Sequence, residues 1–206
     1  MYKFIKIVGL MLSKIYPYAV YKKIYLLKDV LYTSWLSNSF KSFGFKSILK
    51  KDIFLIGNKY ISVGDNTIIG SRAVVTAWDE YGNDKYQPQI IIGSNVCLGD
   101  DCHITAINKI EIADNVLVGK KVTITDNSHG KSNMRSLIIS PVKRSLYSPG
   151  PVYIEDGVWI GDKVTILSDV RIGKNSIIGA NAVVTKNIPP NCIAVGVPAK
   201  IIKVIQ

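Results

Sequence analysis

The side chains best suited to chemistry in this chain are its two histidines, His103 and His129. Histidine is the commonest side chain to remove a proton near neutral pH, so either one is a candidate general base. His129 lies in the segment Asp126-Asn127-Ser128-His129-Gly130, immediately before a long irregular stretch. Catalytic groups tend to lie at such boundaries between a rigid scaffold and a loop. His129 is therefore the predicted base, and a surface histidine beside Gly130 is the alternative.

Other chemistries are less well supported by the sequence. His103 is expected to be an outward-facing, solvated side chain, with an acceptor contact as the alternative. A catalytic zinc site needs three protein ligands and an open position, whereas this chain offers two histidines, expected on dissimilar faces; no metal is predicted. Cys97, Cys102 and Cys192 lie outside the His129 motif and lack CxxC spacing. They predict buried free thiols in a reducing cytoplasm rather than a cysteine nucleophile.

A six-residue repeat provides the scaffold for these groups. Between residues 154 and 188 an aliphatic side chain recurs at every sixth position: Ile154, Ile160, Ile166, Ile172, Ile178 and Val184. Neither the helical period of 3.6 nor the strand period of 2 gives this spacing. A hexapeptide period is typical of a parallel β-helix, in which short strands stack coil on coil.

The repeat is interrupted twice and has asparagine at its corners. Residues 77–89 and 130–153 break the register and are predicted loops. Asparagine tolerates the left-handed backbone that a tight corner requires, and the fourth place of seven hexads holds one: Asn66, Asn95, Asn115, Asn127, Asn175, Asn181 and Asn187. The pattern predicts an all-β triangular prism of about five coils, with aliphatic residues inside and polar residues outside.

Residues 1–52 are predicted to form a basic, helical appendage to the repeat domain, residues 53–206. Residues 1–51 contain ten lysines and one acidic residue, a net charge of +9, whereas the rest carries +2. Apolar residues recur at helical spacing before and after Pro17. Two roles stay open: a cap on the end of the β-helix, and an amphipathic segment resting on an anionic membrane. No recognised motif supports nucleic-acid binding.

The closing segment resembles that of a known family. Residues 158–191, followed by Gly196-Val197-Pro198-Ala199-Lys200, resemble the C-terminal signature of the hexapeptide-repeat acyltransferases. Residues 126–130 and 143–152 resemble segments of bacterial sugar and polysaccharide O-acetyltransferases, in the branch of the galactoside and maltose enzymes. This resemblance, over about residues 60–203, implies a left-handed parallel β-helix, acetyl-CoA as donor, a homotrimer and a sugar acceptor. The free thiols favour a cytoplasmic location, and peripheral contact of residues 1–50 with the inner membrane face is left open.

The resemblance also implies which residues form the site. His129 matches the family's catalytic histidine, and Asp126 and Asn127 are candidates to hold it, with a solvated corner as the alternative for each. The resemblance implies that the donor binds in a groove between subunits, where small residues let an extended ligand approach the backbone. The predicted donor-binding residues are Trp159, Gly161, Asp162, Gly179, Ala180, Thr185, Lys186, Lys200 and Lys203. A solvated lysine-rich tail is the alternative for the last two.

The acceptor site is the part where this chain departs from the family. The galactoside branch uses an asparagine and an aspartate in the preceding coil, but the matching places here lie near Gly99 and Ile107. The predicted acceptor residues are instead Asp100, Asp101, Asn108, Arg144 and Tyr147. The expected reaction is direct acetyl transfer to a sugar hydroxyl in surface-polysaccharide biosynthesis. N-acetylation of a nucleotide-linked amino sugar and a non-catalytic scaffold are the alternatives.

Overall fold

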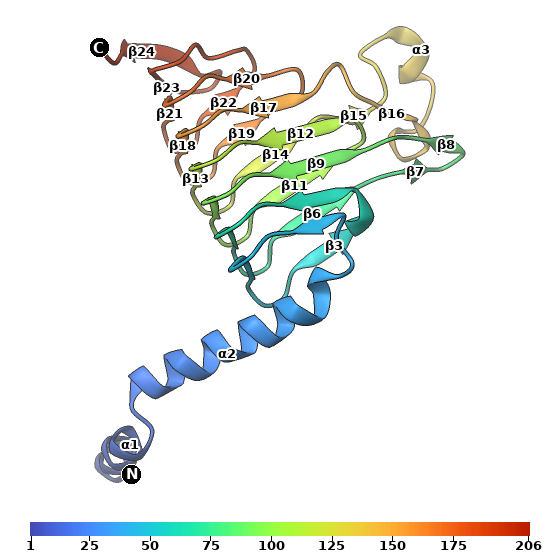
Figure 1. The fold of residues 1–206 in the computed structure, drawn as a ribbon. Helices are drawn as coiled ribbons and strands as arrows, with labels where there is room; N and C mark the ends of the chain where they lie inside the picture. The colour runs from blue at the N-terminus through green and yellow to red at the C-terminus, as the bar shows by residue number, and fades with distance from the viewer.

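The structure, a computed structural model, describes residues 1–206 and is a left-handed parallel β-helix preceded by two helices (Figure 1). Each coil contributes one strand to each of three sheets, which form the sides of a triangular prism. Sheets A and C each contain six strands, so the prism has six coils rather than the predicted five or so. A bridge between Ile172 and Ile188 begins a seventh coil.

The strands of each sheet follow in coil order, from the first coil to the last. Sheet A contains β1 (Ser42–Phe43), β4 (Ile61–Val63), β9 (Gln89–Ile92), β12 (Lys109–Ile112), β17 (Val152–Ile154) and β20 (Arg171–Ile172). Sheet B contains β2 (Ile48–Leu49), β5 (Ile68–Ile69), β10 (Cys97–Leu98), β13 (Leu117–Val118), β18 (Trp159–Ile160), β21 (Ile177–Ile178), β23 (Cys192–Val195) and the antiparallel β24 (Lys200–Val204). Sheet C contains β3 (Phe54–Ile56), β6 (Val74–Ala77), β11 (His103–Ala106), β14 (Thr123–Thr125), β19 (Thr165–Ile166) and β22 (Val183–Val184).

The six-residue repeat places its aliphatic side chains inside the prism. Because successive side chains of a strand point to opposite faces, one residue of each pair points inward. The inward residues are directly stacked, as in Ile92, Ile112 and Ile154 of sheet A, which are all buried. At the corners, Asn66, Asn95, Asn115, Asn175 and Asn181 adopt positive φ as predicted, whereas Asn127 and Asn187 do not.

The β-helix begins earlier than predicted. Strands β1 and β2 precede residue 53 and pair in parallel with β4 and β5, so the predicted boundary at residue 52 falls inside the first coil. Phe43 and Leu49 align with Val63 and Ile69 of the next coil, and Gly44 follows Phe43 as Gly64 follows Val63. The hexapeptide signal is present in this coil, but the surrounding lysines and phenylalanines obscure it.

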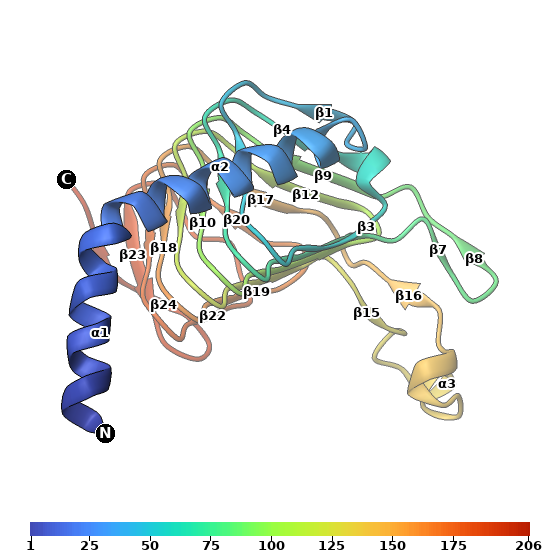
Figure 2. The ribbon, with the colours of Figure 1, turned by 90° about the horizontal axis from the view of Figure 1, so that it is seen from below.

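Two excursions leave the prism from the same corner, where sheet C turns into sheet A (Figures 1 and 2). The first contains the hairpin of β7 (Glu80–Tyr81) and β8 (Asp84–Lys85). The second contains β15 (Ser128–His129), α3 (Met134–Leu137), the 3-10 turn Pro141–Lys143 and β16 (Leu146–Tyr147). The Tyr81 hydroxyl donates to the Val142 carbonyl at 2.8 Å, and the Tyr86 hydroxyl to that of Leu146 at 3.2 Å. The two predicted loops are thus joined to each other.

The two N-terminal helices have different environments. The end of α2 (Tyr18–Ser37) packs on the first coil: Thr33 is buried, and its hydroxyl oxygen accepts a hydrogen bond from the Leu49 amide at 2.9 Å. This contact satisfies an amide on the open edge of β2, as a cap must. Helix α1 (Tyr2–Ile15) has no buried residue and extends beyond the prism (Figure 2). No helix has the length and apolar character needed to cross a membrane.

The outward-facing side chains differ among the sheets. On sheet A the paired outward positions in the last four coils are Ile91, Glu111, Tyr153 and Arg171. On sheet B they form one apolar ladder through every coil: Ile48, Ile68, Cys97, Leu117, Trp159, Ile177 and Ile193. Cys97 is therefore exposed, which corrects the prediction that all three thiols are buried; Cys102 and Cys192 are buried as expected.

Candidate functional site

His129 lies where the chain leaves sheet C for the second excursion. Strand β15 pairs antiparallel with β16, which places His129 opposite Leu146. The imidazole is exposed and meets the edge of the Tyr81 ring, with ring centroids 5.4 Å apart. The hydrogen bonds of this segment involve Asn127 and Ser128, and none engages the His129 imidazole. The imidazole therefore has both nitrogens available to a ligand.

A cavity of about 380 Å³, the His129 pocket, opens beside this imidazole. The outer face of sheet C forms its floor, which includes Thr76, His103 and Thr105. Its walls come from the two excursions, with Tyr81 from the first and Asn127 and Leu146 from the second among them. The pocket thus combines one apolar wall with several hydroxyl, amide and imidazole groups, a composition suited to a small polar ligand.

His103 shares this pocket, which corrects the expectation that the two histidines occupy dissimilar faces. Partial burial lowers the pKa of His103, so its imidazole is neutral at neutral pH and can both donate and accept a hydrogen bond. This placement favours the alternative of an acceptor contact over a merely solvated side chain. No group of three or more histidine, cysteine or carboxylate side chains is arranged to hold a metal ion.

Thr76, which also lines the His129 pocket, has a buried hydroxyl without a hydrogen-bond partner. Its side chain is 3% exposed, and its hydroxyl has no hydrogen-bond partner in the chain. A buried polar group without a partner is costly. Sequence reasoning missed Thr76, Trp78 and Tyr81. The aromatic pair in the first loop, separated by Asp79 and Glu80, was the available signal.

Asp126 has a structural task that the sequence did not predict. It is completely buried, and its two carboxylate oxygens accept hydrogen bonds from the amides of Ile107 at 3.0 Å and Asn108 at 2.9 Å. The Asn127 side chain donates to the same carboxylate at 3.0 Å. Burial raises the pKa of Asp126, opposed by these hydrogen bonds. Its contacts hold the corner of the preceding coil, and no hydrogen bond joins it to His129.

The other predicted acceptor residues are not gathered in the His129 pocket. Asp101 is ion-paired with Arg72 at 2.7 Å, and Asp100 accepts from the Ser71 amide at 3.0 Å, so both serve contacts between coils. They lie at the corner between sheets B and C, whereas His129 lies at the corner between sheets C and A. Arg144 and Tyr147 belong to the second excursion and line a separate cavity of about 260 Å³ beside Gly130. Asn108 lines a third cavity on sheet A.

Five of the predicted donor-binding residues do lie together. Trp159, Gly161, Asp162, Gly179 and Ala180 line a cavity of about 450 Å³ on sheet B, the sheet B groove. Its lining is mainly apolar, and Trp159 is 52% exposed. A side chain at Gly161 is excluded because its Cβ would lie 2.6 Å from the Ala180 nitrogen. The backbones of neighbouring coils therefore pack closely at this position.

Two backbone amides in this groove have no acceptor within the chain. The amides of Gly161 and Gly179 bond the carbonyls of Ile178 and Ala194, so they are not available to a ligand as predicted. The amides of Asp162 and Ala180 make no such bond. In the preceding coil the Lys120 amide bonds the Asp162 carboxylate at 2.8 Å, but Ala180 offers no carboxylate to the Asp162 amide. The backbone N–H groups of Asp162 and Ala180, on successive coils, are thus free to donate a hydrogen bond to a ligand.

The remaining predicted donor residues lie outside the groove. Thr185 and Lys186 are exposed after β22, and Lys200 and Lys203 are exposed on β24. Trp159 does not join the donor and acceptor parts in one chain, because the sheet B groove and the His129 pocket lie on different sides of the prism. The sequence suggested that the two lie close together because Trp159 follows the excursion that begins at His129, but the winding of the coils places them on separate faces.

Comparisons with known proteins agree with this arrangement. The family described as "Bacterial transferase hexapeptide (six repeats)" matches residues 151–186, and "Hexapeptide repeat of succinyl-transferase" matches residues 60–77. An Escherichia coli protein named "Putative lipopolysaccharide biosynthesis O-acetyl transferase WbbJ" is 35% identical over 184 residues, covering 87% of each chain. Escherichia coli galactoside O-acetyltransferase is 34% identical, over 78% of this chain and 71% of its own.

A solved structure with a similar fold is that of AntD, an N-acyltransferase from Bacillus cereus, in complex with dTDP and 3-hydroxybutyryl-CoA. It superposes with a TM-score of 0.68 over 84% of this chain and 87% of its own, at 19% sequence identity. At that identity the likeness concerns the fold.

Proposed function

Because this chain belongs to the hexapeptide-repeat sugar acetyltransferases, we propose that it moves the acetyl group of acetyl-CoA to a hydroxyl of a sugar in bacterial surface-polysaccharide biosynthesis. The observation that supports this most directly is the uncommitted His129 imidazole, which is exposed at a pocket whose other polar groups include His103, Asn127 and the unpartnered Thr76 hydroxyl. The relative with 87% coverage is named for lipopolysaccharide biosynthesis, which supports a polysaccharide acceptor.

His129 supplies the base in the proposed reaction. Its imidazole takes the proton of the acceptor hydroxyl as the oxygen attacks the thioester carbonyl of acetyl-CoA. A donor N–H or O–H of the site stabilises the tetrahedral oxyanion. The intermediate collapses with cleavage of the carbon–sulfur bond, and the leaving thiolate takes the proton from His129. No acyl-enzyme forms, since Cys102 and Cys192 are buried and Cys97 lies on sheet B, away from the His129 pocket.

The sheet B groove is the proposed donor site. The amides of Asp162 and Ala180, which have no acceptor in the chain, bond the carbonyl oxygens of the pantetheine arm. Trp159 and Ile177 provide an apolar wall for the arm. Lys186, Lys200 and Lys203 are exposed at the last coils, where flexible ammonium groups can approach the phosphates.

A homotrimer completes the site in this proposal. One chain carries the sheet B groove and the His129 pocket on different sides, so a donor in the groove cannot meet the base of the same chain. The apolar ladder of sheet B supports the same assembly, because an exposed apolar stripe of this extent marks an interaction surface. In a closed trimer each groove faces the His129 pocket of the neighbouring subunit.

Helix α1 is the proposed contact with the inner face of the cytoplasmic membrane. Ile5 and Leu10 lie off one side of the helix, but six of its exposed apolar side chains share that side at helical spacing: Phe4, Ile7, Val8, Met11, Leu12 and Ile15. Lys6 lies on the opposite side, and Lys3 and Lys14 lie at the border of the apolar side, where they can meet anionic headgroups. Since α2 caps the first coil, α1 is free to lie in the membrane surface.

An acetyl-transfer assay tests the proposed reaction. Full-length protein is incubated with acetyl-CoA and a panel of sugar acceptors, and the acetylated atom is identified by NMR. His129→Ala should lower kcat by about 10²- to 10⁴-fold while the fold is retained, and His103→Ala, in the same pocket, should mainly raise the acceptor KM. Full activity in His129→Ala would reject the mechanism, and acetyl found on an amine would reject an oxygen acceptor.

Vesicle flotation tests the membrane contact. The full chain should float with anionic phosphatidylglycerol vesicles, and a variant lacking residues 2–16 should not. The variant Lys3→Glu, Lys6→Glu, Lys14→Glu, which preserves the apolar side of α1, is the matched control for charge. Unchanged flotation of the truncated chain would reject the contact.

A further inference from the structure

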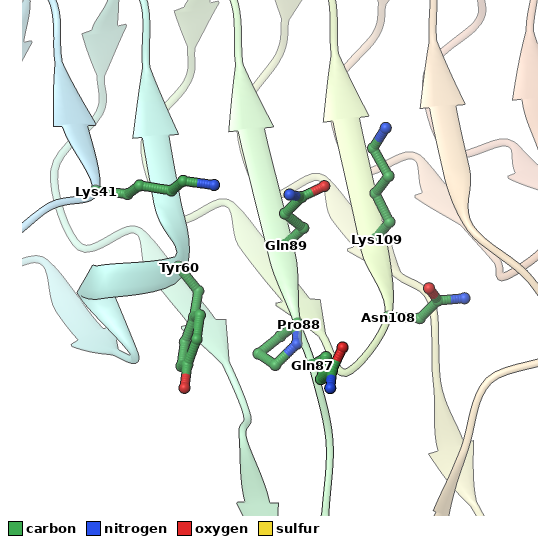
Figure 3. A pocket seen from close by; sticks show the side chains of 7 residues that line it. All are labelled: Lys41, Tyr60, Gln87, Pro88, Gln89, Asn108 and Lys109. Carbon is green, nitrogen blue, oxygen red and sulfur yellow. The ribbon is translucent and has the colours of Figure 1, made fainter.

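A polar groove on sheet A lies on the other side of the first excursion from the His129 pocket. This Lys41 groove has a volume of about 460 Å³ and is lined by Lys41, Tyr60, Gln87, Pro88, Gln89, Asn108 and Lys109 (Figure 3). Gln89 and Lys109 extend from the neighbouring strands β9 and β12, and Lys41 immediately precedes β1, which lies beyond β4. Tyr60, Gln87 and Asn108 lie at the end where the excursion meets the sheet.

Three of the six polar side chains in this groove are uncommitted, whereas the Tyr60 hydroxyl donates to Asp79 and the Asn108 amide donates to Ser148. The side chains of Gln87 and Gln89 make no hydrogen bond within the chain, and Lys41 forms no ion pair. Lys109, in contrast, is paired with Glu111 at 2.7 Å and lies over the Tyr153 ring. Two free amides and one free ammonium group, arranged beside the Tyr60 ring, can donate to and accept from several hydroxyl groups. This is the chemistry required to bind a sugar.

The groove is physically joined to the His129 pocket. Trp78 and Tyr81, on the outgoing limb of the excursion, line the His129 pocket, whereas Gln87 and Gln89, on the returning limb, line the Lys41 groove. Asp126 also links the two sites. Its carboxylate holds the Asn108 backbone on the groove side and the Asn127 side chain on the pocket side.

The face that carries the groove is suited to remain in solvent. Its neighbours on sheet A include Glu111 and the Arg171–Glu155 ion pair, unlike the apolar ladder of sheet B. In the proposed trimer the sheet B faces are covered, so the Lys41 groove stays open to a large acceptor.

From these observations we infer that the Lys41 groove binds a second sugar of a chain acceptor while the reacting sugar occupies the His129 pocket. One sugar ring cannot fill cavities on two sides of a hairpin stem, so the substrate class is an oligosaccharide or polymer rather than a monosaccharide. The inference rests on the proposed acetyl transfer at His129, and it assigns Lys41 and Gln89 as residues that determine acceptor length.

Acceptor-length kinetics with the full-length protein test this assignment. The acceptors are sugar chains of increasing length, prepared by partial hydrolysis of the surface polysaccharide of the source organism, with acetyl-CoA as donor. For the wild type, kcat/KM should rise with chain length. Lys41→Ala and Gln89→Ala should each raise the KM for long acceptors about ten-fold, with the monosaccharide KM, the acetyl-CoA KM and kcat unchanged. Lys174→Ala, an exposed lysine of the last coil, is the matched control and should behave as wild type.

The possible failures are distinguishable. Acetylation of sugars with kcat/KM independent of length, or variants that weaken monosaccharides and long chains equally, would overturn the groove assignment and leave the proposed function standing. Absence of transfer to any sugar by the wild type would overturn both.

Discussion

The sheet B groove and the His129 pocket are built in opposite ways. The groove is made by the uninterrupted repeat: Trp159, Gly161 and Ala180 occupy ordinary hexad positions, and their ligand donors are amides left free by the regular stacking of coils. The pocket is made by interruptions, since His129 and Tyr81 belong to segments that leave the prism. The regular part suits a donor common to a family, whereas the irregular part can vary with the acceptor.

The largest effect on stability is expected on replacement of Asp126, which holds the corner of the coil beside the His129 pocket. Asp126→Ala leaves the buried amides of Ile107 and Asn108 without acceptors, which should lower the free energy of unfolding by on the order of 3 kcal/mol. Urea denaturation measures this loss. His129→Ala, at an exposed residue, is the control and should change stability by less than about 0.5 kcal/mol. Equal effects would show that Asp126 does not hold the corner.

The pH dependence of the unfolding free energy gives a second test of the role of Asp126. Because burial raises the pKa of Asp126, the folded chain binds its proton at a higher pH than the unfolded chain. The unfolding free energy of the wild type relative to Asp126→Asn should therefore increase as the pH falls from neutral through the raised pKa toward the ordinary value of 3.8. A relative stability that decreases over this range would contradict the assigned burial.

Blocking the sheet B groove should impair donor binding alone. Ala180→Arg places a long side chain beside Gly161, and its steric conflict with a bound donor should raise the acetyl-CoA KM about 10- to 100-fold. Acceptor binding at the His129 pocket should be unchanged, as measured by saturation-transfer NMR with a sugar. A variant with unaltered acetyl-CoA KM and an unchanged unfolding midpoint would remove the groove from the donor site.

A change beside His129 should have a smaller effect on catalysis. Tyr81→Ala removes the ring that meets the His129 imidazole and the hydroxyl that joins the excursions, so kcat should fall about ten-fold. Tyr81→Phe retains the ring and should preserve most of the activity. The positioning role requires that Phe rescue kcat; equal losses in both variants would assign the effect to the hydroxyl.

The smallest expected effect concerns thiol labelling at neutral pH. Cys97 is exposed on the apolar ladder of sheet B, so a maleimide should label it slowly in the intact trimer and rapidly after dissociation. Cys102 should stay unlabelled in either state, because burial raises its pKa to about 11 and keeps it protonated. Rapid labelling of Cys97 in a particle of trimer mass would exclude sheet B from the subunit contact.

The contrast between the regular repeat and its interruptions explains which parts of the fold and of the site could be predicted from the sequence. The repeat fixes each inward residue by its spacing, so the β-helix and its core followed from local pattern, whereas the five groove residues were implied by the family resemblance. The first coil was missed because Phe43 and Leu49 are surrounded by residues that also suit a helix. The acceptor side was predicted poorly, because the partners of His129 come from sheet C and from the first excursion.

Asp126 shows why sequence proximity misled. A carboxylate three residues from the predicted base suggested a catalytic partner, but the amides of Ile107 and Asn108, one coil away, bind it instead. Likewise, Trp159 follows the second excursion in the chain yet lies on another side of the prism. Contacts between coils depend on excursion length and winding, which a six-residue pattern does not encode.

In the proposed trimer the two halves of the site meet between subunits, and this arrangement can be tested by co-expression of two impaired chains, assayed at an acetyl-CoA concentration well below the raised KM of Ala180→Arg. One chain carries His129→Ala, the other carries Ala180→Arg, and each has a different affinity tag for tandem purification of mixed trimers. Every mixed trimer then contains one interface with an intact groove and an intact His129, so activity should return to about one third of the wild-type value. Mixed trimers that remain as inactive as either parent would contradict the shared site.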